Sequence, residues 1–331
     1  MKTLLTHEIC RLMNHHLSLE QNRILESTLH QVFANYTLPN VSSDVALETS
    51  QKTRHLIDLF IAAKKIEGCS DNTLKYYSNT LQKMLNSIAK DITLIDTNDL
   101  RLYLSTYQNT RHSSKITLDN IRRIMSSFFS WLEDEDYIIK SPVRRIHKVK
   151  ATQIVKETLS DEHLEQLRDN CSCPRDLAMI DLLISTGIRV GELVKLNRND
   201  INFEERECIV LGKGDKERRV YFDAKSKIHL KQYLDSRTDT NQALFVSQNT
   251  PFKRLSIAGV EKSLSKLGHR SNVQHVHPHK FRRTMATMAI EKGMPIEQVQ
   301  KLLGHAKIDT TLHYAIVNQA GVKLAHRKFV C

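Results

Sequence analysis

Several features of membrane and secreted proteins are missing from this sequence. No apolar run approaches the roughly 18 residues that a membrane-spanning helix requires, and the opening MKTLLTHEIC becomes charged too early for a secretory signal peptide. The six cysteines include no CxxC pair, and a chain of 331 residues needs no disulfide staple. Internal repeats and low-complexity segments are absent as well. We therefore expect a cytoplasmic globular protein with reduced thiols.

The sequence is also short of acidic residues. Lys and Arg number 49 against 37 Asp and Glu, which gives a net charge of +12 and an isoelectric point near 9.4. Charge does not determine a fold, but a strongly basic protein attracts polyanions, and nucleic acid is the commonest of them. A basic surface kept for solubility is the alternative explanation. The length indicates two domains.

Apolar residues recur at helical spacing through most of the first 140 residues. The pattern predicts two short helices within residues 1–40, and the polar stretch NVSSDVALETSQKTR after them is typical of a linker. Residues 55–140 carry successive apolar stripes separated by turns, which predicts an antiparallel four-helix bundle. Ser70 or Asp71 can cap its second helix.

The pattern changes in the second half of the chain. Ser160 is a good N-cap for LSDEHLEQLRD, and the apolar segment RDLAMIDLLISTG predicts a buried helix that ends at Gly187. The segment CIVLGKGDKERRVYF predicts two short strands around a Gly-rich turn, and DINF can supply a third strand. The fold class that follows is mainly α with a small β-sheet, with an N-terminal helical bundle followed by an α+β domain.

These patterns divide the chain into four segments. We predict an N-terminal helical extension over residues 1–45, a helical domain over 50–142, a basic linker over 143–157, and a second domain with a C-terminal tail over 158–331. The run KSPVRRIHKVK holds five Lys and Arg residues and no acid, and Pro142 argues against a helix there. Such a run is either a solvated loop or a segment that lies along phosphates.

Conspicuous polar residues lie in the second domain, and each has an ordinary explanation when it is taken alone. Arg189 and Glu192 are three residues apart, so they share a helix face and could form a surface ion pair. His279 and Arg282 have the same spacing and could belong to a basic helix start. Lys213 lies at the predicted hairpin tip, where a solvated lysine is common.

Together with His305 and Tyr314, these residues suit metal-free phosphoryl transfer. An arginine fork grips two phosphate oxygens at once, and two forks with histidine donors would stabilise a five-coordinate phosphorus. A tyrosine hydroxyl, whose pKa is ordinarily about 10, becomes a nucleophile where cations favour its anion. A lysine on a hairpin can deliver a proton to the departing oxygen. This chemistry requires no cofactor.

The arrangement resembles the tyrosine recombinases, or phage-type integrases, which include the Xer, Cre and lambda integrase groups. The motifs STGIRVGEL, LGKGDKERRV, HPHKFRRTMAT and LLGHAKIDTTLHYA match that family in order and interval. Residues 155–320 match closely, whereas residues 55–140 resemble the family's core-binding helical domain less specifically. By this resemblance the catalytic set is Arg189, Lys213, His279, Arg282, His305 and Tyr314, with Glu192 as the supporting acid.

The resemblance implies a mechanism and a partner. Tyr314 would attack the scissile phosphate and leave a 3′-phosphotyrosine with a free 5′-hydroxyl, a step that a different 5′-hydroxyl reverses. Lys213 would be the general acid, His279 would orient the phosphate and manage the proton of Tyr314, and His305 would lie against the phosphate. The expected function is site-specific recombination of double-stranded DNA, by integration, excision or inversion. Family members often pass the segment after the tyrosine to the next protomer in a ring of four, so a tetramer on DNA is expected.

DNA contacts outside the active site are predicted from cations and one tyrosine, each of which also suits an ordinary surface position. The segment 140–150 is expected to cross the duplex, so that the two domains clamp it from opposite faces. Residues 1–45 lack a basic face, which favours protein contact or packing for them. The predicted DNA-binding residues are Lys75, Tyr76, Lys115, Arg122, Arg123, Arg144, Arg145 and Lys148.

Three other hypotheses compete with recombination. The histidines of HVHPH (His275, His277 and His279) could ligate zinc, but no acidic residue stands nearby to complete a two-metal nuclease, and Pro278 spoils a regular strand. A DNA-binding regulator without catalysis would need the charge but not Tyr314. A type-IB topoisomerase would share the chemistry but would act without a specific site.

Overall fold

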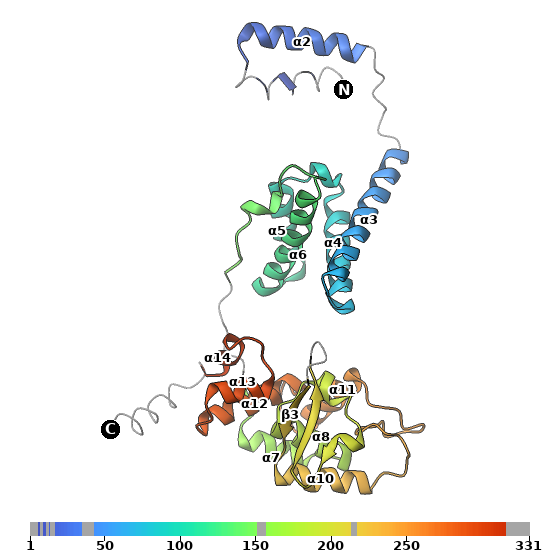
Figure 1. The fold of residues 1–331 in the computed structure, drawn as a ribbon, viewed down its shortest axis with the longest axis vertical. Coiled ribbons are helices and arrows are strands. Elements are labelled where there is room, and N and C mark those ends of the chain that lie inside the picture. Colours follow the sequence, from blue (N-terminus) through green and yellow to red (C-terminus); the bar gives the residue numbers. More distant parts are fainter. Residues whose placement is uncertain are drawn as a thin grey trace, which may run out of the picture. The chain divides into compact units, whose positions relative to one another are not determined.

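The computed structural model divides into two compact units, Met1–Thr152 and Gln153–Cys331, each with its own hydrophobic core (Figure 1). The protein is mainly helical with one small sheet, as predicted. No helix in the described part of the chain is long and apolar enough to cross a membrane. The structure describes residues 6, 9, 10, 13, 17–34, 43–150, 157–212 and 217–315.

The four helices predicted over residues 55–140 are present in the first unit. Ser70 caps the second of them by accepting a hydrogen bond from the backbone N–H of Thr73. Aromatic side chains fill the core, where the rings of Phe60 and Phe128 meet edge to face at 5.2 Å. The described elements of this unit are α2 (Leu19–Ala34), α3 (Ser43–Ile66), α4 (Asp71–Ile88), η1 (Ile92–Leu94), α5 (Thr97–Arg111), α6 (Lys115–Asp134) and η2 (Pro142–Arg145).

The prediction of a linker before residue 55 is wrong from Ser43 onward, because α3 begins there. Residues 43–66 contain neither Gly nor Pro, and a helix extends easily once a packed turn has formed, since each added residue contributes another hydrogen bond. The buried turn that contains Leu56, Ile57 and Phe60 supplies this start. Polarity alone therefore misled the interpretation. Most of the first helix predicted within residues 1–40 lies outside the described residues.

The basic run after α6 follows the surface of the first unit. Pro142 begins the short 3-10 turn η2, where its missing N–H costs nothing, and Val143 is buried beside the helical core. The hydroxyl of Thr97 donates to the carbonyl of Pro142 (2.8 Å), and the N–H of Val149 donates to Asp119 (3.1 Å). Residues 143–149, which we predicted as linker, are thus packed on the helical unit.

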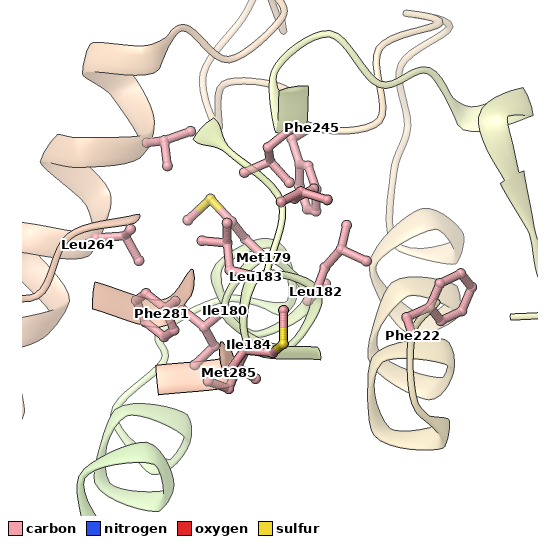
Figure 2. Packing of buried hydrophobic residues seen from close by; sticks show 14 of the residues in the cluster. Met179, Ile180, Leu182, Leu183, Ile184, Phe222, Phe245, Leu264, Phe281 and Met285 are labelled. Carbon is pink, nitrogen blue, oxygen red and sulfur yellow. The ribbon is translucent and has the colours of Figure 1, made fainter. Parts of the chain in front are cut away.

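The second unit is organised around α8, whose side chains occupy the middle of its core. Figure 2 shows Met179, Leu182 and Leu183 there, surrounded by apolar residues of α11, α12 and the segment after β3. The described elements are α7 (Asp161–Asp169), α8 (Pro174–Thr186), α9 (Val190–Leu193), η3 (Arg198–Asp200), β1 (Ile201–Asn202), β2 (Glu207–Leu211), β3 (Glu217–Tyr221), α10 (Ala224–Asp235), α11 (Ile257–Arg270), α12 (Pro278–Glu291), α13 (Ile296–Leu303) and α14 (Asp309–Ala315).

The sheet has the antiparallel order β1-β2-β3, which confirms the predicted hairpin and its third strand. Cys208 and Val220 pair and are buried, whereas Ile209 and Arg219 pair on the exposed face. Because side chains alternate along a strand, Arg218 lies on the same face as Val220, toward the body of the unit. Strand β3 also contacts α13, which ends directly before Gly304 and His305.

Candidate active site

The site begins at the break after α8. Gly187 ends this helix in the left-handed region, with φ of 61°, and a Cβ there would collide with Cε of Met285. Arg189 then caps the short helix α9, and its backbone N–H donates to Oε2 of Glu192 at 2.8 Å. The sequence Gly-Ile-Arg therefore turns the chain sharply and fixes the backbone of Arg189 beside Glu192.

Glu192 is a buried carboxylate shared by two arginines. Only 4% of it is exposed, and Oε1 accepts from Nη1 of Arg189 at 2.9 Å. Arg218 binds the same carboxylate through both of its terminal nitrogens, at 2.6 and 2.7 Å. Burial by itself would raise the pKa of Glu192, but the bonds from Arg218 and Arg189 outweigh it and lower that pKa. Arg189 and Glu192 therefore do not form an ordinary surface ion pair, which was the alternative explanation for their spacing in the sequence.

Arg282 lies deep in α12, with 3% of its surface exposed. Nη1 donates to the carbonyl of Gly187 (2.6 Å), and Nη2 donates to the carbonyl of Leu303 (2.5 Å). Burial and the neighbouring charge of Arg189 lower the pKa of Arg282 to about 10, so the guanidinium is charged at neutral pH. A buried guanidinium that bonds carbonyls but no carboxylate is costly unless an anion joins it.

Arg189 and Arg282 meet at the end of α13. Nη2 of Arg189 donates to the carbonyl of Gly304 at 3.1 Å, next to the Leu303 carbonyl that Arg282 holds. Among the described residues, Arg189 and Arg218 bind the single negative charge of Glu192 and Arg282 lies within its electrostatic influence, which leaves two positive charges in excess. The two guanidiniums that we predicted to converge do converge, and the excess charge suits a phosphate.

His305 follows Gly304 and contacts Arg282 directly. Because a guanidinium can only donate, Nε2 of His305 accepts the bond from Nη2 of Arg282 (3.0 Å). The ring proton is therefore on Nδ1, where the hydroxyl of Thr311 accepts it at 2.9 Å. Burial and the surrounding arginines lower the pKa of His305 to about 4. The imidazole is thus neutral, and in this state it orients Arg282.

Tyr314 stands on α14, which packs against α12 and α13. Its ring lies 6.0 Å from the ring of His305, tilted by 31°, and it is half-buried against the core of the second unit. The turn at Gly304, where φ is +64°, allows α14 to fold back in this way. The two residues of LLGHAKIDTTLHYA that we singled out therefore meet, although nine positions separate them.

His279 and Lys213 are the remaining members of the predicted set. His279 is exposed on the first turn of α12, one helical turn before Arg282 and on the same face. Lys213 lies in the segment 213–216 between β2 and β3, outside the described residues. Within the described ranges, no three His, Cys, Asp or Glu side chains are grouped so that they could hold a metal ion, and this includes the histidines of HVHPH.

Two residues of the site were missed by sequence reasoning. Arg218 was overlooked among the cations of LGKGDKERRV. It stands two residues before Val220 in a predicted strand, and this spacing indicates that both side chains face the interior. An arginine on the inward face of a strand needs a buried partner. Thr311 was overlooked because a threonine in a helix is ordinary. Its position three residues before Tyr314 places both on one face of α14.

The residues predicted to bind DNA differ in how free they are. Lys75, Tyr76 and Lys115 are exposed on α4 and α6. Arg122 is 15% exposed at its side chain and bound to Asp119 at 2.9 Å, so it has less to offer a phosphate than its neighbours. Arg123 and Arg144 are exposed although each forms an ion pair, Arg123 with Asp119 and Arg144 with Glu133, both at 3.2 Å. Arg145 and Lys148 are exposed as well.

Comparison with known proteins identifies related sequences over most of the chain. The family model described as the phage integrase family matches residues 152–320, and that of a phage integrase N-terminal SAM-like domain matches residues 56–139. Tyrosine recombinase XerC of Oceanobacillus iheyensis is 32% identical over 82% of this chain and 94% of its own length. Tyrosine recombinase XerC of Leptospira interrogans is 32% identical over 88% of this chain and 96% of its own.

Solved structures share the fold. XerH site-specific recombinase, crystallised on a palindromic difH substrate in a post-cleavage complex, matches with a TM-score of 0.66 and 22% identity, covering 98% of this chain and 94% of XerH. A lambda integrase dimer bound to a COC′ core site matches with a TM-score of 0.65 and 19% identity, covering 88% and 86%. These similarities extend over both units of the chain.

Proposed function

The chain belongs to the phage integrase family of tyrosine recombinases, and from this membership we propose that it cuts and rejoins DNA at specific sites through Tyr314. One observation carries the assignment to these residues. Arg189 and Arg282 hold consecutive carbonyls directly before His305, and the ring of His305 faces that of Tyr314 at 6.0 Å. The uncompensated guanidiniums and the nucleophile therefore share one small region.

The proposed reaction is an in-line exchange at phosphorus. The Oη atom of Tyr314 attacks the scissile phosphate, the bond from phosphorus to the 5′-oxygen breaks, and a 3′-phosphotyrosine forms. Lys213 gives its proton to the departing 5′-oxygen, and His279 manages the proton that Tyr314 loses. Arg189 and Arg282 stabilise the extra negative charge of the five-coordinate phosphorus. A different 5′-hydroxyl then reverses the step, so the bond energy is conserved.

Covalent capture tests the function even though the target sequence is unidentified. The protein is incubated with a pool of duplexes that have a randomised centre and one nick within it. After cleavage beside the nick the short fragment with the 5′-hydroxyl diffuses away, so rejoining cannot occur. A protein–DNA adduct on a denaturing gel, with the DNA attached to a peptide that contains Tyr314, is the expected result.

Two controls accompany the capture. Tyr314→Phe is expected to give no adduct, and the wild type is expected to give an undiminished yield in EDTA. An adduct in the phenylalanine variant would contradict the assignment of Tyr314, and loss of the adduct in EDTA would favour the metal hypothesis. Relaxation of supercoiled plasmid that lacks the captured sequence would favour a topoisomerase. The absence of any adduct from the wild type would contradict the function itself.

The proposed partner is double-stranded DNA that carries a specific recombination site, and the proposed location of the activity is the cytoplasm. The solved XerH and lambda integrase complexes with DNA support assembly on the duplex. The finer proposal is a tetramer on two duplexes, in which the segment after Tyr314 passes to the next protomer. Residues 316–331 lie outside the described part of the chain. Deleting the residues after 318 should abolish assembly on DNA but leave the binding of single protomers intact.

Phosphate contacts complete the proposal. The exposed cations of α4, α6 and the run 140–150 would lie along the duplex and fix its register, and the two domains would clamp it from opposite faces. The proposed division is a helical core-binding domain over residues 50–142, a linker over 143–157 and a catalytic domain over 158–331, with residues 43–49 joined to the helical domain by α3 and residues 143–149 by their packing on it. Lys75, Tyr76, Lys115, Arg122, Arg123, Arg144, Arg145 and Lys148 remain the proposed contacts.

A further inference from the structure

Arg218, on β3, donates from all three nitrogens of its guanidinium to other groups of the protein. Nη1 and Nη2 bind the two oxygens of Glu192 at 2.6 and 2.7 Å, and Nε donates to the carbonyl of Leu302 at 3.0 Å. Its side chain is 13% exposed, against 36% for that of Arg189. Arg218 is therefore placed behind the arginine that faces the phosphate, and not against the phosphate.

The shared carboxylate connects the two arginines. Both oxygens of Glu192 accept from Arg218, and each also accepts once from Arg189, through Nη1 and through the backbone N–H. An arginine next to a free carboxylate prefers to bind it with two parallel hydrogen bonds. Because Arg218 already holds that bidentate position, Arg189 reaches Glu192 through one terminal nitrogen only. Its other terminal nitrogen then remains on the carbonyl of Gly304.

Arg218 also packs on the turn that precedes His305. A Cβ at Gly304 would lie 3.0 Å from Cδ of Arg218 and 3.2 Å from its Nε. The stem of Arg218 thus lies against the residue whose carbonyl receives Arg189, and Nε holds the carbonyl of Leu302 at the end of α13. One side chain therefore connects β3, α9 and the turn at Gly304.

We propose that Arg218 is a positioning residue of the reaction, which holds Glu192 so that Arg189 keeps one edge of its guanidinium available for the scissile phosphate. The proposal rests on the proposed function. Without Arg218, Glu192 takes the bidentate position on Arg189 and draws its guanidinium away from the carbonyl of Gly304. The phosphate then loses one of its two forks.

The test measures single-turnover cleavage of the nicked duplex recovered by covalent capture. Arg218→Gln should slow adduct formation on the order of 100-fold, as expected for a misplaced catalytic group, while affinity for the duplex stays within about threefold because other phosphate contacts remain. Arg219→Gln is the matched control. Arg219 is adjacent on β3 but exposed, and its ion pair with Glu207 spans 3.3 Å, so its rate should equal that of the wild type.

Arg218→Lys guards against loss of folding. Lysine keeps the charge beside Glu192 but cannot form the two parallel bonds, so the variant should fold and still cleave slowly. The double variant Arg218→Gln with Glu192→Gln separates positioning from stability. Without the carboxylate, nothing at position 192 draws Arg189 away from the carbonyl of Gly304 and the phosphate. The double variant should therefore cleave faster than Arg218→Gln alone. A residue that only supported the fold would give no such recovery.

A duplex with sulfur in place of the bridging 5′-oxygen identifies the group through which Arg218 acts. A thiolate leaves without a proton, so this substrate removes the need for the lysine of the hairpin. The defect of Arg218→Gln should persist on it. Recovery on the sulfur substrate, or a wild-type rate in Arg218→Lys, would overturn the proposal. If the wild type itself forms no adduct, the proposed function fails instead, so the two failures are distinguishable.

Discussion

At the residue scale, hydrogen-bond partners determine the protonation state of His305 and of Glu192. His305 has an arginine on one ring nitrogen and a threonine hydroxyl on the other, which fixes a neutral ring with its proton on Nδ1. Glu192 has two arginine partners and stays ionised although it is buried. The site thus holds its charge pattern without a ligand, so the proposed entry of a phosphate would require little reorganisation.

The neutral state of His305 predicts a dependence of stability on pH. Its pKa is about 4 in the folded protein, against 6.5 for an ordinary histidine. The unfolded chain therefore binds a proton that the folded chain does not, and stability falls as the pH drops from about 6.5 towards 4. His305→Gln, which cannot titrate, should lose about 1–2 kcal/mol less than the wild type between pH 7 and pH 5. Urea denaturation at both pH values measures this, and equal losses would contradict the assignment.

Thr311 should matter through its hydroxyl. In Thr311→Val the N–H at Nδ1 of His305 is left without its acceptor, which costs about 1–3 kcal/mol when buried. We expect a lower melting temperature, and, because the ring of His305 then no longer holds Arg282 in place, roughly tenfold slower adduct formation. Thr311→Ser keeps the hydroxyl and should behave like the wild type. Nitrogen NMR of the His305 imidazole and the cleavage rate are measured for both variants. A valine variant with wild-type NMR shifts and a wild-type rate would contradict this role.

At the element scale, two helix ends bring the site together. α8 ends at Gly187 and α13 ends at Gly304, both in the left-handed region, and each of these glycines offers its carbonyl to an active-site arginine. The left-handed cap exposes the carbonyls of the last turn. The helix breaks therefore position the guanidiniums as well as reversing the chain.

Gly187→Ala tests the first of these breaks. The positive φ strains any residue with a Cβ, and the added methyl would collide with Met285. We expect a loss of about 2–4 kcal/mol from these two effects together. Gly191→Ala is the matched control, because that glycine lies in α9 with nothing within 4 Å of its Cβ position. Urea denaturation followed by circular dichroism compares the two, and an equal stability would contradict the strain at Gly187.

At the scale of the whole molecule, the basic charge and the two separate cores are the main features. Each unit has its own buried cluster, and the run 140–150 packs its apolar residues on the first unit while Arg144, Arg145 and Lys148 stay exposed. A charged segment fixed on a folded surface costs less entropy on binding than a free loop does. The net charge of +12 adds a long-range attraction to any polyanion.

Neutralising Arg144 and Arg145 should therefore weaken DNA binding and flatten its salt dependence. Each phosphate contact that is lost reduces the slope of log K against log salt by about 0.9, so the double glutamine variant should lose up to about 2. Titrations of a duplex at several salt concentrations give the slope. An unchanged slope in the double variant would remove the run 140–150 from the DNA interface.

Local sequence was sufficient to predict the family and the helix breaks. Gly187, Ser160 and the hairpin strands were predictable because caps, turns and alternation act between residues that are near in sequence. The start of α3 was not predictable in this way, since polarity hides how far a packed helix extends.

Which groups touch depends instead on how the chain packs. Contacts between helices, strands and turns decide three features of the site. They bring Arg218 to Glu192, they place the hydroxyl of Thr311 at His305, and they bring Arg189 and Arg282 to the carbonyls of residues 304 and 303. Most of these contacts join segments that are far apart in the chain. Local pattern carries little information about them, because a charged residue looks the same in sequence whether it faces water or a buried carboxylate.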